Sequence, residues 1–166
     1  MMSALSDLNR LLGRELATLR DELLAYPDDA SVWALPAGVP NSAGTLTLHL
    51  AGNLRFFIGT QLGATGYVRD RDAEFSTRGV PRDELVQLVE RTADEVTRTL
   101  AALDPAALAA PFPVEVGGLR LETQRFLFHL EAHIAYHLGQ IDYHRRVVTG
   151  HSRSVGALPL PPLADH

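Results

Sequence analysis

Apolar residues recur at helical spacing along four segments of the chain. The first segment carries six leucines, three or four residues apart, that form one stripe of a helix: Leu5, Leu8, Leu12, Leu16, Leu19 and Leu23. Ser3 is a suitable N-cap for this helix, and Pro27 with the two aspartates after it is expected to end it. The stretch from about residue 26 to 44 holds Trp33 among prolines and glycines and is expected to form a loop.

A second helix is expected to begin at Asn41 or Ser42, both good N-caps, and to end at Gly63 or Gly66. One side of this helix gathers residues that are expected to face inward: Leu46, His49, Leu50, Asn53, Phe56 and Phe57. The next stretch, residues 67–80, consists mostly of charged and small residues and is expected to form another loop.

A third helix is expected to begin at Pro81, because the first turn of a helix tolerates proline, and to end before Asp104-Pro105. The fourth is expected over residues 121–148, with Gly150 after its last turn. A short extended piece at residues 114–116, followed by a glycine pair, separates the two helices.

Four such segments predict an all-α protein, a four-helix bundle that spans residues 1–150. The remaining residues, 151–166, are rich in proline and predict a loose or extended C-terminal tail.

Composition narrows the function classes. The net charge of -5 and the lack of a clustered basic face argue against nucleic-acid binding. The chain has no cysteine, which excludes disulfides, thiolate metal sites and a nucleophilic thiol of its own. No window approaches the roughly 20 apolar residues of a membrane span, and the N-terminus lacks the pattern of a secretory signal. A cytoplasmic protein without a membrane partner is therefore expected.

Three of the seven histidines, His129, His133 and His137, lie four residues apart in the fourth helix. Each such step turns the helix by roughly 40° beyond a full turn, so two of these side chains fit one ion better than three. The string from His129 to His133 differs from the zinc-protease motif, because Glu131 does not follow the first histidine directly.

Two histidines on one helix need a further ligand from another element, and His49 is the best candidate. It lies inside an apolar helical face, where a lone imidazole would need a partner. Three imidazoles with open positions are typical of a catalytic site and suit zinc, nickel, iron or copper. The alternative is a metal-free helical interaction or ligand-binding module, in which these histidines are hydrogen-bonded core residues.

The chain resembles the DinB/YfiT-like superfamily of metal-dependent four-helix proteins. The resemblance rests on Trp33 with its Pro/Gly-containing loop, on NSAGTLTLHLAGNLRFFIG around His49, and on HLEAHIAYHLGQID with His133, His137, Gly139 and Gln140. It extends from the first helix to about residue 148. The family implies a bundle with up-down-down-up helix order, usually as a homodimer, and one divalent metal ion on three histidines.

By position, the ligands that the resemblance implies are His49, His133 and His137, and His129 matches an extra histidine that is usually not a ligand. Zinc and nickel are the expected ions. Enzymatic members of the family use a low-molecular-weight thiol, such as bacillithiol or mycothiol, with a small-molecule electrophile. This implies a thiol-dependent S-transferase, and the alternative is a non-catalytic metal-binding stress or regulatory protein.

Polar residues close to the histidines in the sequence are candidates for supporting roles. Gln140 and Asn53 are expected to orient the substrate or a ligand imidazole. Glu131 and Asp142 are candidate acceptors behind the ligands, but a position on a solvated helix face is the preferred interpretation for each.

Overall fold

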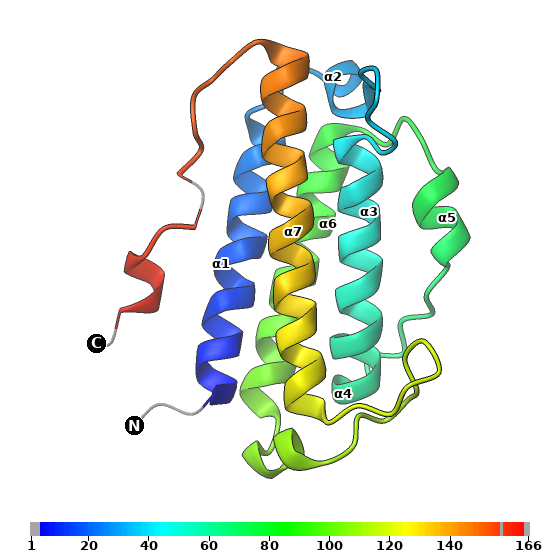
Figure 1. Ribbon diagram of the computed structural model, residues 1–166, viewed down its shortest axis with the longest axis vertical. Coiled ribbons are helices and arrows are strands. Elements are labelled where there is room, and N and C mark those ends of the chain that lie inside the picture. The colour runs from blue at the N-terminus through cyan, green and yellow to red at the C-terminus, as the bar shows by residue number, and fades with distance from the viewer. Residues whose placement is uncertain (1–3, 157, 165–166) are drawn as a thin grey trace.

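The computed structural model describes residues 4–156 and 158–164 (Figure 1). Its elements in chain order are α1 (Ala4–Leu24), α2 (Asp29–Trp33), α3 (Ala43–Leu54), η1 (Arg55–Thr60), α4 (Gln61–Gly63), α5 (Arg71–Ser76), α6 (Arg82–Ala102), η2 (Pro105–Ala109), α7 (Thr123–Thr149) and η3 (Pro161–Leu163). Within the described ranges, β structure is confined to isolated bridges in the connection between η2 and α7. The all-α class predicted from the sequence is confirmed.

Four long elements make up the body of the molecule: α1, α6, α7 and the continuous run α3–η1–α4 (Figure 1). Helix α1 packs against α6 and α7, and α3 packs against the same two helices. All six leucines of the predicted α1 stripe are buried, at 5% exposure or less. They meet apolar side chains from the other three elements, among them Leu50, Leu54, Leu85, Leu100, Leu130 and Ile134.

The predicted second helix is one unbroken run from Ala43 to Gly63, but its middle, Arg55–Thr60, is a π-helix. Ser42 caps its start, because the Ser42 hydroxyl oxygen accepts a hydrogen bond from the Thr45 amide at 3.1 Å. A π-turn inserts one residue per turn and so rotates everything after it relative to an α-helix. The N-cap proposed for the first helix, Ser3, lies outside the described residues.

Glycines allow close packing along this run. A Cβ atom at Gly44 would collide with the Trp33 ring, at Gly52 with the Glu74 carboxylate, and at Gly59 with the Glu95 carboxylate. Each of these contacts brings a residue from a different part of the chain against the run. Tertiary packing therefore requires glycine at these three positions. Without that requirement glycine would be unfavourable there, because it lowers the stability of a helix by about 1 kcal/mol relative to alanine.

Replacing Gly44 with alanine is expected to displace the indole of Trp33 and to destabilise the protein by about 1–3 kcal/mol, the usual cost of overpacking. The new Cβ would lie 2.7 Å from two ring carbons of Trp33. The Trp33 ring is held in place by its Nε1–H, which donates to the Val80 carbonyl oxygen at 2.9 Å. Trp33 is the chain's single tryptophan, so its fluorescence reports the displacement directly. An unchanged emission maximum and an unchanged denaturant midpoint would contradict this packing.

Two short helices occupy stretches that were predicted to be loops. The side chain of Asp28 caps α2 by accepting from the Ser31 amide, and that of Asp70 caps α5 by accepting from the Ala73 amide. An aspartate N-cap can start a helix in a stretch without apolar periodicity. Helix α5 packs on α3, and this contact matters for the site.

The described part of the C-terminal tail is tied to the bundle. The guanidinium of Arg10 in α1 donates to the Ala164 carbonyl oxygen at 2.9 Å, and Arg145 and Arg146 in α7 donate to the carbonyls of Arg153 and Ser152. Among the described residues, no helix has the length and apolar character needed to cross a membrane.

Candidate metal centre

Three imidazoles meet between α3 and α7. The Nε2 atom of His133 lies 3.3 Å from Nε2 of His49 and 3.2 Å from Nε2 of His137. The donor atoms of all three lie within 4.8 Å of one another. Nitrogen ligands bonded to one tetrahedral ion at about 2.0–2.1 Å are about 3.3 Å apart, so two of the separations already match that spacing.

Hydrogen bonds at the far side of two rings orient their Nε2 atoms. The Nδ1 atom of His49 lies 3.0 Å from the Glu74 carboxylate, and Nδ1 of His137 lies 2.7 Å from the Gln140 carboxamide oxygen. Both partners are acceptors, so each Nδ1 carries the proton and each Nε2 presents a lone pair. Lone pairs that converge on one point are stabilised by a cation, and this donor set therefore fits a metal ion.

His133 lies between the other two and is kept neutral. Burial, together with the charges of His137, His49, His129 and Arg69, lowers the pKa of His133 to about 4. Burial also lowers the pKa of His137, although its hydrogen bond to Gln140 opposes this. Metal ligands must be deprotonated, so both rings are ready to bind an ion at neutral pH. The Nδ1 atom of His133 is buried and has no hydrogen-bond partner among the described residues.

The metal-free protein is expected to lose stability as the pH falls from about 7 to 5. Burial lowers the pKa values of His133, His137 and His144 below the ordinary 6.5 in the folded state. The unfolded chain therefore binds protons first, so stability is complete above pH 6.5 and decreases as the pH falls toward the folded-state values. Urea unfolding of chelator-treated protein across this range measures the effect. A midpoint that stays constant or rises on acidification would contradict it.

Glu74 contacts a candidate ligand, and this contact was not predicted from the sequence. It lies in α5, in the stretch expected to be a charged loop, yet it is buried at 5% exposure against His49. Burial acts to raise the pKa of Glu74, but hydrogen bonds from Arg69 and His49 outweigh it and hold the pKa below 4.5. The N-cap signal of Asp70 could have indicated a helix here, although not its contact with α3.

Comparison with protein families gives a direct assignment. The family model of the DinB superfamily matches residues 8–141, which include all three histidines. The chain belongs to the DinB superfamily. Comparisons with curated proteins and with solved structures found no match.

The remaining histidines of this DinB protein have other surroundings. The ring of His129 is exposed and stacks on Phe126 and His133, with centroids 5.8 Å and 6.2 Å away. His144 is buried on another side of α7, where its Nε2–H donates to the Ala34 carbonyl oxygen at 2.8 Å and its Nδ1 accepts from the Tyr26 hydroxyl at 2.7 Å. Both nitrogens of His144 are satisfied, so it is a core residue.

The polar residues that were expected to support the site differ in what they contact. Gln140 contacts the His137 ring, as was expected of a residue that orients a ligand imidazole. The carboxamide oxygen of Asn53 is buried without a partner in the described residues. Asp142 pairs with Arg145 and Arg146 instead of a histidine.

Aromatic rings lie against two of the three histidines of the candidate metal centre. Phe75 of α5 packs on the His49 ring at a centroid distance of 4.8 Å, and Tyr136 lies 5.3 Å from His137. Phe57 packs in the core with Phe112 and Phe126. Phe57 therefore packs against the hydrophobic core, whereas Phe75 and Tyr136 lie against the histidine rings.

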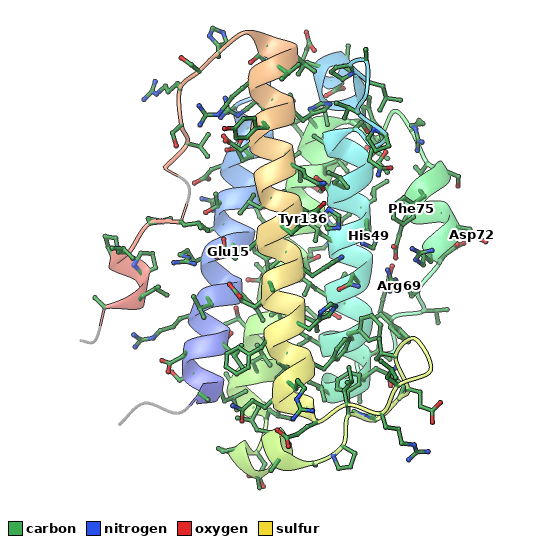
Figure 2. All side chains as sticks on the ribbon, in the orientation of Figure 1. Glu15, His49, Arg69, Asp72, Phe75 and Tyr136 are labelled. Carbon is green, nitrogen blue, oxygen red and sulfur yellow. The ribbon has the colours of Figure 1, made fainter. Side chains whose placement is uncertain are left out.

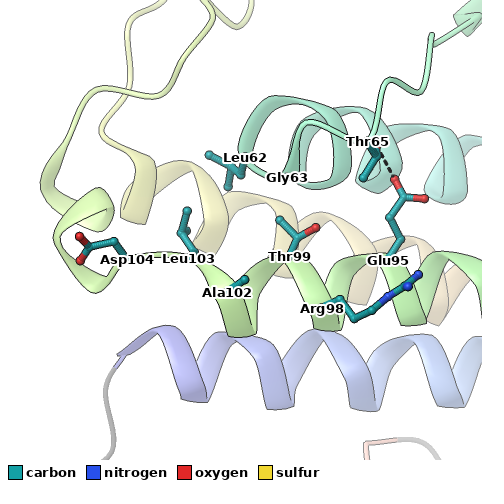
Figure 3. Close-up of a pocket in the computed structure, with 9 residues that line it drawn as sticks. All are labelled: Leu62, Gly63, Thr65, Glu95, Arg98, Thr99, Ala102, Leu103 and Asp104. Atoms are coloured by element: carbon teal, nitrogen blue, oxygen red, sulfur yellow. Dashed lines mark hydrogen bonds between the residues drawn. The ribbon is translucent and has the colours of Figure 1, made fainter.

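Large cavities lie away from the three histidines. One of 480 Å³ lies between the end of α4 and helix α6 and is lined by Thr65, Glu95, Arg98 and Thr99, among others (Figure 3). A second, of 290 Å³, is lined by Gln140, Tyr143 and His144 and so adjoins the partner of His137. We take the histidines as the candidate functional site, because their donor atoms converge there and, among the described residues, no comparable group of donor atoms lines the larger cavity.

Proposed function

We propose that this DinB protein binds one divalent metal ion, zinc or nickel, through the Nε2 atoms of His49, His133 and His137, and that it activates the thiol of a low-molecular-weight cosubstrate there. The observation that carries the proposal is the convergence of three imidazoles, in which the Nε2 atoms of His137 and His49 lie 3.2 Å and 3.3 Å from Nε2 of His133. Three protein ligands leave positions open for a substrate, as in catalytic sites.

His49, His133 and His137 would hold the divalent ion without neutralising its charge, and the ion would supply the positive charge that lowers the pKa of a nearby thiol. The chain has no cysteine, so the thiol comes from a cosubstrate such as bacillithiol or mycothiol. The thiol proton passes to solvent, a sulfur–carbon bond forms with an epoxide or alkyl halide, and the carbon–oxygen or carbon–halogen bond breaks with its electron pair on the leaving group. We further propose that Asn53, which lies one helical turn after His49 in α3 and whose side-chain oxygen has no partner in the described residues, orients a substrate donor.

Metal content of the untagged protein tests the first half of this proposal. We expect close to one zinc or nickel ion per chain by elemental analysis after purification or reconstitution, and a loss of the ion in His49→Ala. Protein that takes up no divalent ion even after reconstitution would contradict the proposal and would favour the metal-free alternative, in which the histidines are core residues.

Turnover tests the second half. The metal-loaded protein is incubated with bacillithiol, mycothiol or glutathione and with styrene oxide or monochlorobimane, and the thioether is quantified by mass spectrometry. We expect a thioether in excess of the uncatalysed reaction with at least one thiol, and its loss on chelation. Stoichiometric metal without turnover across the whole panel would contradict the transferase and favour a non-catalytic metal-binding protein.

We also propose that the chain forms a homodimer with the up-down-down-up helix order implied by its family. Helix α7 carries large exposed apolar side chains that a second copy could cover, among them Tyr136, Tyr143 and Val147. Light scattering after gel filtration should then give twice the chain mass of 18.1 kDa. A mass of a single chain at micromolar concentration would contradict the dimer.

A further inference from the structure

A buried ion pair lies directly behind the candidate metal centre. Two nitrogens of Arg69 donate to Glu74, Nε to Oε1 at 2.7 Å and Nη2 to Oε2 at 2.8 Å, and Oε2 also contacts Nδ1 of His49 at 3.0 Å. Figure 2 shows Arg69 and Phe75 reaching toward His49 from the α5 side of the molecule. A buried carboxylate is costly unless it is paired and hydrogen-bonded, and here both oxygens of Glu74 have partners.

Several independent features hold Glu74 at this position. Asp70 caps α5 one turn before it, and Phe75 packs on the His49 ring. Gly52 in α3 leaves the space that the carboxylate occupies, because a Cβ there would overlap Oε1 of Glu74. The guanidinium of Arg69 lies 5.6 Å from the centre of the Phe57 ring. Residues of α3 and of the stretch around α5 therefore pack together around the Glu74 carboxylate.

A second Arg–Glu ion pair also lies against a helix glycine, but it joins two elements without contacting any histidine that the structure describes. Arg55 in the π-helix pairs with Glu95 in α6 at 3.0 Å, and Gly59 leaves the space for the Glu95 carboxylate. Glu95 also accepts from the Thr65 hydroxyl, as Figure 3 shows, and no described contact links it to a histidine. The Arg55–Glu95 pair is therefore a matched control for the Arg69–Glu74 pair.

We propose that Glu74, held by Arg69, is a positioning residue for His49: it accepts the Nδ1–H and thereby fixes the His49 Nε2 lone pair toward the other two imidazoles. The inference rests on the proposed metal binding and assigns the stretch around α5 a role in it. Partners that orient a metal-binding histidine contribute about 10–100-fold to metal affinity, because they fix the tautomer and the ring orientation. We expect a loss within that range when Glu74 is removed.

Zinc affinity, measured by competition with a chromophoric chelator on the full-length protein, tests the proposal in two matched pairs of variants. Glu74→Ala and Gly52→Ala are expected to weaken zinc binding by about 10–100-fold. Glu95→Ala and Gly59→Ala disturb an equivalent ion pair and are expected to bind zinc within about twofold of the wild type. Glu74→Gln keeps an acceptor oxygen and should retain more affinity than Glu74→Ala. Equal affinity in Glu74→Ala and wild type, or equal losses in both pairs, would overturn the proposal.

The tautomer of His49 in the metal-free protein supplies a readout that does not depend on metal binding. Imidazole ¹⁵N chemical shifts should show His49 as the Nδ1–H tautomer in the wild type and a mixture in Glu74→Ala. If the wild type binds no zinc but shows this change, the proposed function fails while the positioning role stands. A His49 tautomer that does not respond to Glu74→Ala would overturn the positioning role, whatever the zinc affinity.

Discussion

Replacing His133 with alanine is expected to abolish stoichiometric zinc binding. His133 is the shared neighbour of the other two candidate ligands, with its Nε2 at 3.3 Å from that of His49 and 3.2 Å from that of His137. Its removal leaves His49 and His137 on separate helices with no imidazole between them. We expect the zinc affinity to fall by more than the roughly 10–100-fold that follows the loss of a residue hydrogen-bonded to a metal-binding histidine. Isothermal titration of chelator-treated protein with zinc measures the effect.

Two histidines on the same helix serve as controls for this experiment. His129→Ala removes an exposed ring that stacks on Phe126 and His133, and His144→Ala removes a core ring that is hydrogen-bonded to Tyr26. Both variants are expected to bind one zinc ion. His144→Ala should nevertheless be less stable, because it removes the hydrogen bonds of the buried ring to the Tyr26 hydroxyl and the Ala34 carbonyl oxygen. Zinc binding that survives in His133→Ala, or that is lost in His144→Ala, would show that the ligands are assigned wrongly.

Replacing Arg145 with methionine is expected to lower the free energy of unfolding by about 3–5 kcal/mol, the usual cost of breaking a buried ion pair. Arg145 is 2% exposed and its Nε donates to the Glu22 carboxylate of α1 at 2.5 Å. Glu22 has no exposed surface, so the variant would leave its charge buried without this partner. The same guanidinium donates to the Arg153 carbonyl oxygen, so the C-terminal tail should also become more accessible to protease.

The double variant Glu22→Leu with Arg145→Met distinguishes an unpaired charge from lost packing. It removes both charges and is expected to recover most of the stability, while Asp142 keeps its pair with Arg146 at 2.9 Å. Arg120→Met breaks an exposed pair with Glu115 and should change stability by no more than about 0.5 kcal/mol. Denaturant unfolding of the four proteins gives the comparison. A double variant no more stable than Arg145→Met would contradict this account.

The long helices could be predicted because the spacing of apolar residues along the sequence indicates which face of each helix is buried. The six-leucine stripe of α1 is buried along its whole length, and Gly150 follows α7 in the left-handed conformation that favours glycine, with φ of 71°. Ser42 acts as the cap that its position suggested. Each of these signals depends on neighbours within a few residues, which is what sequence patterns record.

The features that escaped prediction depend on contacts between distant residues. The π-helix at Arg55–Thr60 has no local signature, and the partners of Gly52 and Gly59 are carboxylates 22 and 36 positions later in the sequence, Glu74 and Glu95. The short helix α5 lacks apolar periodicity, so its buried Glu74 looked like part of a solvated loop. Such elements are formed by tertiary packing against α3 and α6, which overrides weak local preference.

The candidate site also has residues that the sequence predicted and residues that it did not. The spacing of His133 and His137 placed two imidazoles on one face, and the structure brings His49 to them from another helix. Gln140 was expected to act near this pair and contacts His137. Glu74 and Arg69 could not be placed beside His49, because nothing in the sequence relates the stretch after α4 to the middle of α3.

Anomalous diffraction at the zinc absorption edge, from crystals of the zinc-loaded protein, tests the central claim most directly. We predict one strong peak between α3 and α7, within about 2.0–2.1 Å of the Nε2 atoms of His49, His133 and His137. A peak that omits one of these nitrogens in favour of His129, or zinc bound only at surface sites, would contradict the three-histidine site and the function proposed from it.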